Sequence, residues 1–233
     1  MSSLVKILLH CDGADASTSF PDSSNYAHSL TTNVNSQVDT AQSKFGGAAY
    51  LGAANGDLLT MLDSEELNLA ANDFTIDVWV RFSSLVLTVF FEQFLVLNRS
   101  ISIYWNTDNT LHFAYSPDGT TSIDTGRSWT PSADTWYHIA LVREGDTAQL
   151  FIDGVILGAS YDLTGVTINN SSAPVSVFGS VNNANQYCLV GWADEFDFVN
   201  GEARWPVGSN FTPPTQAYTL TTPLSQMMMM GVS

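Results

Sequence analysis

The sequence has very few positively charged side chains. Lysine and arginine number 7 against 23 aspartate and glutamate residues, which gives a formal net charge of −16 at pH 7. Such an excess of negative charge repels phosphate backbones and anionic lipid headgroups. Nucleic acid is therefore excluded as a partner.

Long hydrophobic runs are also lacking. A membrane-spanning helix needs about 18 consecutive apolar residues, and the closest run, "LVLTVFFEQFLVL" at residues 85–97, is interrupted by Glu92 and Gln93. The opening stretch "MSSLVKILLHCDG" is short, contains Lys6 and has no small-residue cleavage site. We therefore expect a soluble chain that is made in a cytoplasm without an export signal and that does not insert into a membrane.

Cysteine and histidine are too scarce for a disulfide or transition-metal framework. The two cysteines, Cys11 and Cys188, are expected to stay reduced, and the four histidines show no zinc-ligand spacing. The sequence contains neither a Gly-x-Ser-x-Gly elbow nor a glycine-rich phosphate loop. Zinc, nucleotide and serine-nucleophile chemistry are therefore not indicated.

What the sequence does contain is a two-residue hydrophobic period. In "FTIDVWVRF", residues 74–82, apolar side chains occupy alternate positions, which is typical of a half-buried strand. The stretch "WYHIALVREGDTAQLFIDGVILGAS" predicts three more strands, with a tight hairpin turn at Asp153-Gly154. Only residues 63–69 suggest a short helix. These patterns predict an all-β fold, a two-sheet antiparallel sandwich or jelly roll.

Several segments together resemble the laminin G-like branch of the concanavalin A-like lectin/glucanase superfamily, of the type found in tailed-phage structural proteins. The matching pieces are "LLHCDGADASTSFPDSS", "AQSKFGGAAYLGAANGDLLTMLDSEELNLAANDFTIDVWVRF", "TWYHIALVREGDTAQLFIDGVILG", "GWADEFDFVNGEARW" and "NFTPPTQAY". The departures are the apolar insertion at 85–97 and the tail after Tyr218. The resemblance implies a jelly roll over residues 1–218, with a concave sheet that often presents a glycan groove, and leaves 219–233 as a C-terminal tail. It implies no activity, because this fold hosts lectins, hydrolases, lyases and structural modules.

One acidic strand is similar to the catalytic strand of hydrolases on this fold. Glu195 and Asp197 match the first two carboxylates of a Glu-x-Asp-x-(x)-Glu pattern, but Val199 or Asn200 stands where the third would be. A retaining mechanism needs two carboxyl groups about 5 to 5.5 Å apart. We therefore expect a structural strand that has no catalytic residue. Simple alternation directs Asp194 with two phenylalanines to one face, and Glu195 and Asp197 to solvent or a groove.

Calcium is the one metal that the resemblance favours. Asp12 follows the first strand and Asp194 lies on the last, and related folds often hold a structural calcium where the terminal strands pair. Carboxylate and carbonyl oxygens suit this ion. The alternative is an ordinary turn aspartate and a hydrogen-bonded aspartate.

Glycan binding would use an exposed ring for stacking and carboxylates or amides for the hydroxyls. Trp79 shares the polar face of its strand with Asp77 and Arg81, so these three residues, with Glu195 and Asp197, form the candidate glycan site. The alternative is that the 85–97 insertion or the C-terminal segment packs on Trp79.

The leading functional hypothesis is a non-enzymatic virion component, a head decoration, fibre or tail module that binds host surface glycans. The alternatives are a soluble lectin module and a polysaccharide-cleaving hydrolase or lyase. The tail ends in four consecutive methionines, Met227, Met228, Met229 and Met230. Flexible, polarizable methionine side chains suit irregular partner grooves, so we expect them to dock on another virion protein or on a second copy of the chain. The alternative is that the tail folds back on its own sandwich.

Overall fold

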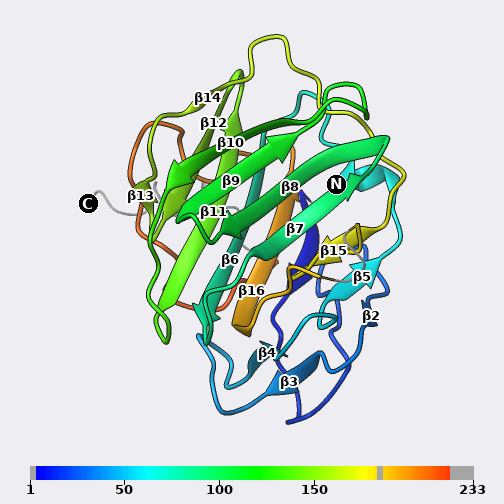
Figure 1. Ribbon diagram of the computed structural model, residues 1–233, viewed down its shortest axis with the longest axis vertical. Helices are drawn as coiled ribbons and strands as arrows, with labels where there is room; N and C mark the ends of the chain where they lie inside the picture. The colour runs from blue at the N-terminus through cyan, green and yellow to red at the C-terminus, as the bar shows by residue number, and fades with distance from the viewer. Residues whose placement is uncertain (1–3, 183–185, 221–233) are drawn as a thin grey trace, which may run out of the picture.

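The computed structural model describes residues 4–182 and 186–220. Its strands form two antiparallel sheets packed face to face, which confirms the all-β sandwich (Figure 1). The nine-stranded sheet contains β13 (Val155–Ile156), β12 (Thr147–Ile152), β11 (Trp136–Glu144), β6 (Phe74–Phe82), β16 (Gly191–Asn200), β4 (Ala49–Gly52) and β3 (Gln37–Asp39), with β1 (Val5–Leu9) paired to β16 and β14 (Tyr161–Asp162) to β12. The seven-stranded sheet contains β10 (Ile123–Ser128), β9 (Thr110–Tyr115), β8 (Asn98–Asn106), β7 (Thr88–Leu95), β15 (Val175–Val177), β5 (Leu59–Met61) and β2 (Thr31–Thr32).

The expected helix at residues 63–69 is one 3₁₀ turn, η1 (Glu65–Leu67). No helix in the described part of the chain is long and apolar enough to cross a membrane. The apolar stretch 85–97 is strand β7 with its flanks, so it packs in the seven-stranded sheet and not over Trp79. Cys11 and Cys188 are both buried and are not joined by a disulfide.

Strand β6 organises the nine-stranded sheet. It pairs with β11 on one side and β16 on the other. Its apolar positions lie in the core between the sheets, as alternation predicts, and they are Phe74, Ile76, Val78, Val80 and Phe82. Its other face, with Asp77 and Trp79, points away from the seven-stranded sheet. The candidate glycan residues on β6 therefore lie on the outer face of the nine-stranded sheet.

Strand β16 departs from simple alternation because it carries a β-bulge. Asp194 is opposite Trp79 and Asp197 is opposite Asp77, so two residues of β16 face one residue of β6. Glu195, within the bulge, has a left-handed backbone with φ of 50°. The expectation that Asp194 shares a face with Phe196 and Phe198 is therefore wrong. The extra residue shifts Asp194 to the outer face, together with Asp197.

The C-terminal segment covers this outer face. Residues 202–218, here called the strap, follow β16 and run along the side of the nine-stranded sheet that faces away from the other sheet (Figure 1). Trp205 packs on Ala140, Val142 and Phe151 of the sheet. Phe211 stacks on Trp205 with ring centroids 4.0 Å apart. The predicted docking residues Met227 to Met230 lie outside the described residues, so that prediction and the 219–233 tail boundary stay predictions.

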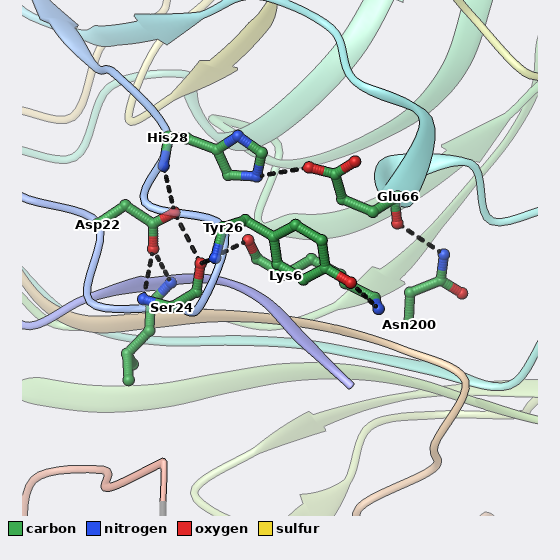
Figure 2. Close-up of polar contacts among 8 residues, drawn as sticks. Lys6, Asp22, Ser24, Tyr26, His28, Glu66 and Asn200 are labelled. Atoms are coloured by element: carbon green, nitrogen blue, oxygen red, sulfur yellow. Dashed lines mark hydrogen bonds and ion pairs between the residues drawn. The ribbon is translucent and has the colours of Figure 1, made fainter. Parts of the chain in front are cut away.

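The long loop after β1 is held by a buried carboxylate. Asp22 accepts hydrogen bonds from the backbone N–H groups of Leu8, Ser24 and His28, each at 2.9 Å, and from the Ser24 hydroxyl at 2.8 Å (Figure 2). His28 also lies 3.2 Å from Glu66 of η1. Both oxygens of Asp22 are thus satisfied, as is usual for a buried carboxylate that serves only the fold.

Candidate binding site on the outer face of the nine-stranded sheet

The carboxylates of the acidic strand are buried and paired with groups from this same chain. Glu195 is 1% exposed; it lies 2.8 Å from His10 Nδ1 and accepts a hydrogen bond of 2.8 Å from the backbone N–H of Tyr218. Asp197 is fully buried and forms an ion pair with Arg204 of the strap. The expectation that Glu195 and Asp197 face solvent or a groove is therefore wrong, because the strap covers them.

Asp77 completes this covered network. Its Oδ2 lies 3.0 Å from His138 Nε2, and the hydroxyl of Tyr218 donates to the same oxygen. Burial disfavours the charged form of Arg204, but the carboxylates of Asp197 and Asp77 outweigh that effect and hold its pKa above the usual value. Each carboxylate of the network has a partner inside the molecule. It fastens the strap to the sheet and presents no carboxylate to a polysaccharide.

Trp79 is also covered, but at the border of a pocket. It is 5% exposed, so the expected open stacking surface is wrong. The Lys44 ammonium lies 3.7 Å from the centre of a Trp79 ring, and Phe45 meets Trp79 edge to face at 6.0 Å. Both residues belong to the loop between β3 and β4. This loop packs on the tryptophan, and residues 212–215 of the strap line the pocket beside it.

The pocket at this border has a volume of about 510 Å³. Its walls come from five separate parts of the chain. They comprise Lys44, Phe45, Trp79, Trp136, Asp153 and strap residues Thr212, Pro213, Pro214 and Thr215. The volume falls within the range of about 300 to 1,000 Å³ that is usual for small-molecule sites. Of the predicted glycan residues, only Trp79 lines the pocket.

The polar groups of the pocket are held in place by the sheet. Asp153 lies in the hairpin turn between β12 and β13, and its Oδ1 accepts a hydrogen bond of 2.8 Å from the backbone N–H of His138. The strap crosses that turn so closely that a Cβ on Gly154 would collide with the carbonyl oxygen of Phe211. Gly154 also has φ of 74°, so glycine satisfies both requirements. Burial lowers the pKa of Lys44.

Arg81 does not line the pocket. Its guanidinium lies 2.6 Å from Asp134 and 5.1 Å from a ring centre of Trp192. The prediction that Arg81 contacts a glycan therefore finds no support in this pocket and stays a prediction.

The predicted pairing of the terminal strands is confirmed. β1 pairs with β16. The Asp12 side chain lies close enough to Asp194 for its negative charge to contribute to the raised pKa of Asp194. Burial raises the pKa of Asp194 to about 7, opposed by hydrogen bonds from two backbone N–H groups. Asp12 Oδ1 and Asp194 Oδ1 are both buried and have no hydrogen-bond partner among the described residues. Two such oxygens fit a hard cation that prefers oxygen ligands.

These two carboxylates could supply only part of a metal coordination shell. Within residues 4–182 and 186–220, no group of three or more His, Cys, Asp or Glu side chains is placed to hold a metal. Calcium accepts backbone carbonyls and water as further ligands. The donor set therefore suits calcium better than zinc.

No local sequence pattern marks Lys44, Trp136 and Asp153 as pocket residues. Trp136 begins a predicted strand and Asp153 belongs to a predicted hairpin turn, so the sequence pattern indicates only a structural role for each.

A further polar cluster that sequence reasoning missed lies on the seven-stranded sheet, where Tyr104 stacks on His112 with ring centroids 4.5 Å apart. Asp124 binds both side chains. Cross-strand contacts of this kind depend on strand pairing and register.

The chain is thus a two-sheet antiparallel sandwich with an aromatic-lined pocket beside its outer face. The family is shown directly by the sequence: a laminin G-like family model, described as the concanavalin A-like lectin/glucanases superfamily, matches residues 55–204. This chain belongs to that superfamily. No curated protein matches the sequence.

Solved structures with the same fold include binding domains of bacterial toxins. The binding domain of Paraclostridial Mosquitocidal Protein 1 is 16% identical, with a TM-score of 0.65 over 95% of this chain and 51% of that one. The ligand-binding domain of botulinum neurotoxin serotype D, solved with N-acetylneuraminic acid, is 10% identical, with a TM-score of 0.63 over 86% and 48%. The binding domain of serotype G is 13% identical, with a TM-score of 0.61 over 98% and 51%. The chain spans about half the length of these proteins, and at these identities the likeness shows the fold alone.

Proposed function

We propose that this protein is a non-enzymatic, lectin-like module that binds a saccharide in the pocket between Trp136, Lys44 and the strap. The observation that carries the proposal is the pocket itself, about 510 Å³ in volume and lined by aromatic rings together with charged and hydroxyl-bearing side chains. Sugars present apolar C–H faces and rings of hydroxyl groups. A pocket that combines both kinds of wall matches both kinds of surface.

Each wall has a role in this proposal. Trp136 offers a ring for the C–H face of a sugar, because Lys44 already lies over Trp79. The Lys44 ammonium donates hydrogen bonds to sugar hydroxyls, and the Asp153 carboxylate accepts them. Thr215 of the strap adds a hydroxyl at the opposite wall. The predicted role of Trp79 becomes that of a support which holds Lys44 in position.

A binding role is favoured over catalysis by the state of the carboxylates. Hydrolysis of a glycosidic bond needs an acid and a nucleophile or base, both open to the substrate. Glu195, Asp197 and Asp77 are each buried and bonded to partners from the chain. Asp153 is a pocket carboxylate with no second acid among the lining residues.

The solved relatives support a binding role only by analogy. They are binding domains, and one was solved with a sialic acid. This chain corresponds to about half of each solved binding domain. The sialic acid in the solved complex therefore does not locate a sugar site in the half that this chain matches. The saccharide bound by this chain is therefore left to measurement.

The proposal is tested by glycan-array screening followed by calorimetry with the best ligand. Trp136→Ala is expected to weaken binding about 5- to 150-fold if a sugar stacks on the ring as strongly as a nucleobase does, which contributes about 1 to 3 kcal/mol. Trp192→Ala is the matched control, since Trp192 lies on the same sheet face but outside the pocket. Equal losses for the two variants, or no glycan bound by the wild-type chain, would reject the pocket as a sugar site.

We also propose that this module serves in a virion, as a decoration, fibre or tail component. The support is the resemblance of the "ARW" and "NFTPPTQAY" segments to versions found in tailed-phage proteins. Both segments belong to the strap, which here closes the outer sheet face. Mass spectrometry of purified particles is the direct test, and particles without this chain would end the proposal.

A further inference from the structure

The hairpin that joins β7 to β8 displays aliphatic side chains at its tip, residues 95–97. Leu95 pairs with Asn98, so Val96 and Leu97 form a two-residue turn. Leu97 is 73% exposed and has φ of 64°. A left-handed backbone is costly for a bulky side chain, and glycine or asparagine is usual at such a turn position. The chain thus holds an apolar side chain in solvent where a small polar one would cost less.

A second pocket, about 400 Å³ in volume, lies at the β2 edge of the seven-stranded sheet. Its lining residues are Ser29, Thr31, Asn33, Thr60, Met61, Leu62, Pro174 and Val181. Leu62 on its wall is 82% exposed. Val34, next to the lining residue Asn33, is also exposed and has φ of 50°, which is an outlier for a β-branched side chain. Two exposed aliphatic side chains therefore border this edge pocket.

The tip and the edge pocket belong to one continuous surface. Val181, which lines the pocket, precedes Asn182. Asn182 Oδ1 accepts a hydrogen bond of 3.4 Å from the backbone N–H of Val96, and its side-chain amide donates to the carbonyl oxygen of Phe94. Strand β15, which follows the lining residue Pro174, lies between β7 and β5 (Figure 1). An apolar projection and a hollow thus stand next to each other.

The tip and the edge pocket are free of charged side chains, although the chain carries a net charge of −16. The segments around them, 23–38, 93–98 and 163–193, contain no aspartate, glutamate, lysine or arginine. The flanking charge of Asp63 is bonded to Gln93. Protein interfaces are depleted of charged residues at their centre. Two copies of this acidic chain would therefore repel each other least where both present this surface.

We infer that two copies of the chain pair through this surface about a twofold axis, with the tip of each copy in the edge pocket of the other. A twofold interface needs one self-complementary patch, and a projection beside a hollow meets that need. A foreign partner would use either feature alone, whereas a second copy uses both. Pairing removes Leu97 and Leu62 from water, which offsets the cost of the left-handed backbone. The saccharide pocket lies on the other sheet, so this pairing is independent of saccharide binding.

The pairing is expected to be weak, because the contact is small and the net negative charge of each copy opposes approach. Sedimentation velocity of the full chain should show a monomer when dilute and a dimer when concentrated. Added salt should strengthen the pairing, because it screens the repulsion between the copies.

Leu97→Asn is expected to weaken this association about tenfold or more, as truncation of a central apolar side chain does. Asparagine tolerates a left-handed backbone, so the Tm of this variant should not fall. Ile123→Thr is the matched control. Ile123 is an exposed aliphatic side chain on β10, at the opposite edge of the same sheet.

A charge-pair experiment tests the exchange of tips directly. Leu97→Asp places a carboxylate on the tip, and Leu62→Lys places an ammonium group at the edge pocket. Each variant alone should lose its association, because each brings a charge against an apolar surface. A mixture of the two should form a heterodimer, in which one contact joins opposite charges and the other is unchanged.

Recovery of pairing in the mixture, with Ile123→Thr behaving as wild type, is the expected result. A wild-type chain that stays monomeric at every concentration overturns the pairing. Self-association that Leu97→Asn leaves unchanged, or that deletion of residues 219–233 abolishes, also overturns it, because either result places the contact elsewhere. Loss of pairing in both charged variants without recovery in their mixture rejects the exchange of tips.

Discussion

The ion pair between Arg204 and Asp197 gives the sharpest test of how the strap is held. Asp197 is fully buried and Arg204 nearly so, and Asp77 lies opposite Asp197 on β6. Arg204→Met keeps most of the aliphatic side chain and removes only the positive charge. Asp197 is then left buried beside Asp77 with no counter-charge. We expect this variant to be strongly destabilised.

The size of the loss follows from burial. Removing one partner of a buried ion pair costs about 3 to 5 kcal/mol. In a chain of this size, each kcal/mol shifts Tm by about 2 to 4 °C, so the expected fall is about 6 to 20 °C. Arg81→Met is the matched control, because it breaks the pair with Asp134, whose side chain is 69% exposed. Exposed pairs contribute about 0 to 1 kcal/mol, or less than about 4 °C.

The loss also has an expected pH dependence. Burial raises the pKa of Asp197, and Arg204 opposes that rise. Without the arginine, the folded-state pKa rises further above the unfolded value, so the folded chain binds the proton more readily. The deficit of Arg204→Met should then be fully present above the raised pKa of the variant and should shrink as pH falls through that value to about 7, the pKa of Asp197 with its arginine in place.

Thermal unfolding followed by circular dichroism, with urea titration at pH 9 and pH 7, measures these differences. Asp197→Asn added to Arg204→Met removes the unpaired charge and should recover part of the lost stability. If Arg204→Met costs no more than Arg81→Met at pH 9, the strap does not depend on this pair. The account of the covered acidic network would then be wrong.

Three further predictions concern the strap, the thiols and the tail. Gly154→Ala should lower Tm in thermal melts by more than Gly145→Ala does. Both glycines have positive φ, but of the two only Gly154 lacks room for a Cβ. Equal losses of Tm would contradict the close approach of the strap. Burial raises the pKa of Cys188 to about 11 and that of Cys11 well above its usual value. Both thiols should therefore resist a thiol reagent at pH 7 until the chain unfolds. Rapid labelling of the native protein would refute this prediction. Deleting residues 219–233 should leave a folded monomer that no longer joins its assembly, whereas unfolding of the truncated chain would assign the tail to the domain itself.

Local patterns predicted the elements of the sandwich well where alternation is unbroken. The core face of β6 and the three strands from Trp136 onwards follow directly from the period of two. Alternation failed on β16, because the bulge at Glu195 adds a residue that no pattern of apolar and polar letters marks. Side chains after the bulge point to the faces that alternation predicts, but Asp194, before the bulge, points to the opposite face from the one predicted.

The candidate site could be predicted only in part, because its exposure depends on contacts distant in sequence. Trp79 was singled out as a large ring on a polar face, and it does line a pocket. Lys44 and Phe45, which lie on the tryptophan, are more than 30 residues away from it in the sequence. The strap residues that line the same pocket are more than 130 residues away. The partners of Asp77 are likewise a histidine on β11 and a tyrosine on the strap. Burial of an outer sheet face cannot be derived from the sheet's own sequence.

The position of β16 in the nine-stranded sheet imposes an order on folding. This strand is the last within residues 4–182 and 186–220, yet it lies between β6 on one side and β1 and β4 on the other. Until residues 191–200 leave the ribosome, β6 and β1 each present an unpaired edge rich in apolar side chains. Such edges invite pairing with other chains. A nascent chain that has not yet reached these residues therefore lacks the centre of one sheet, and its assembly is completed by long-range pairing, which is slow.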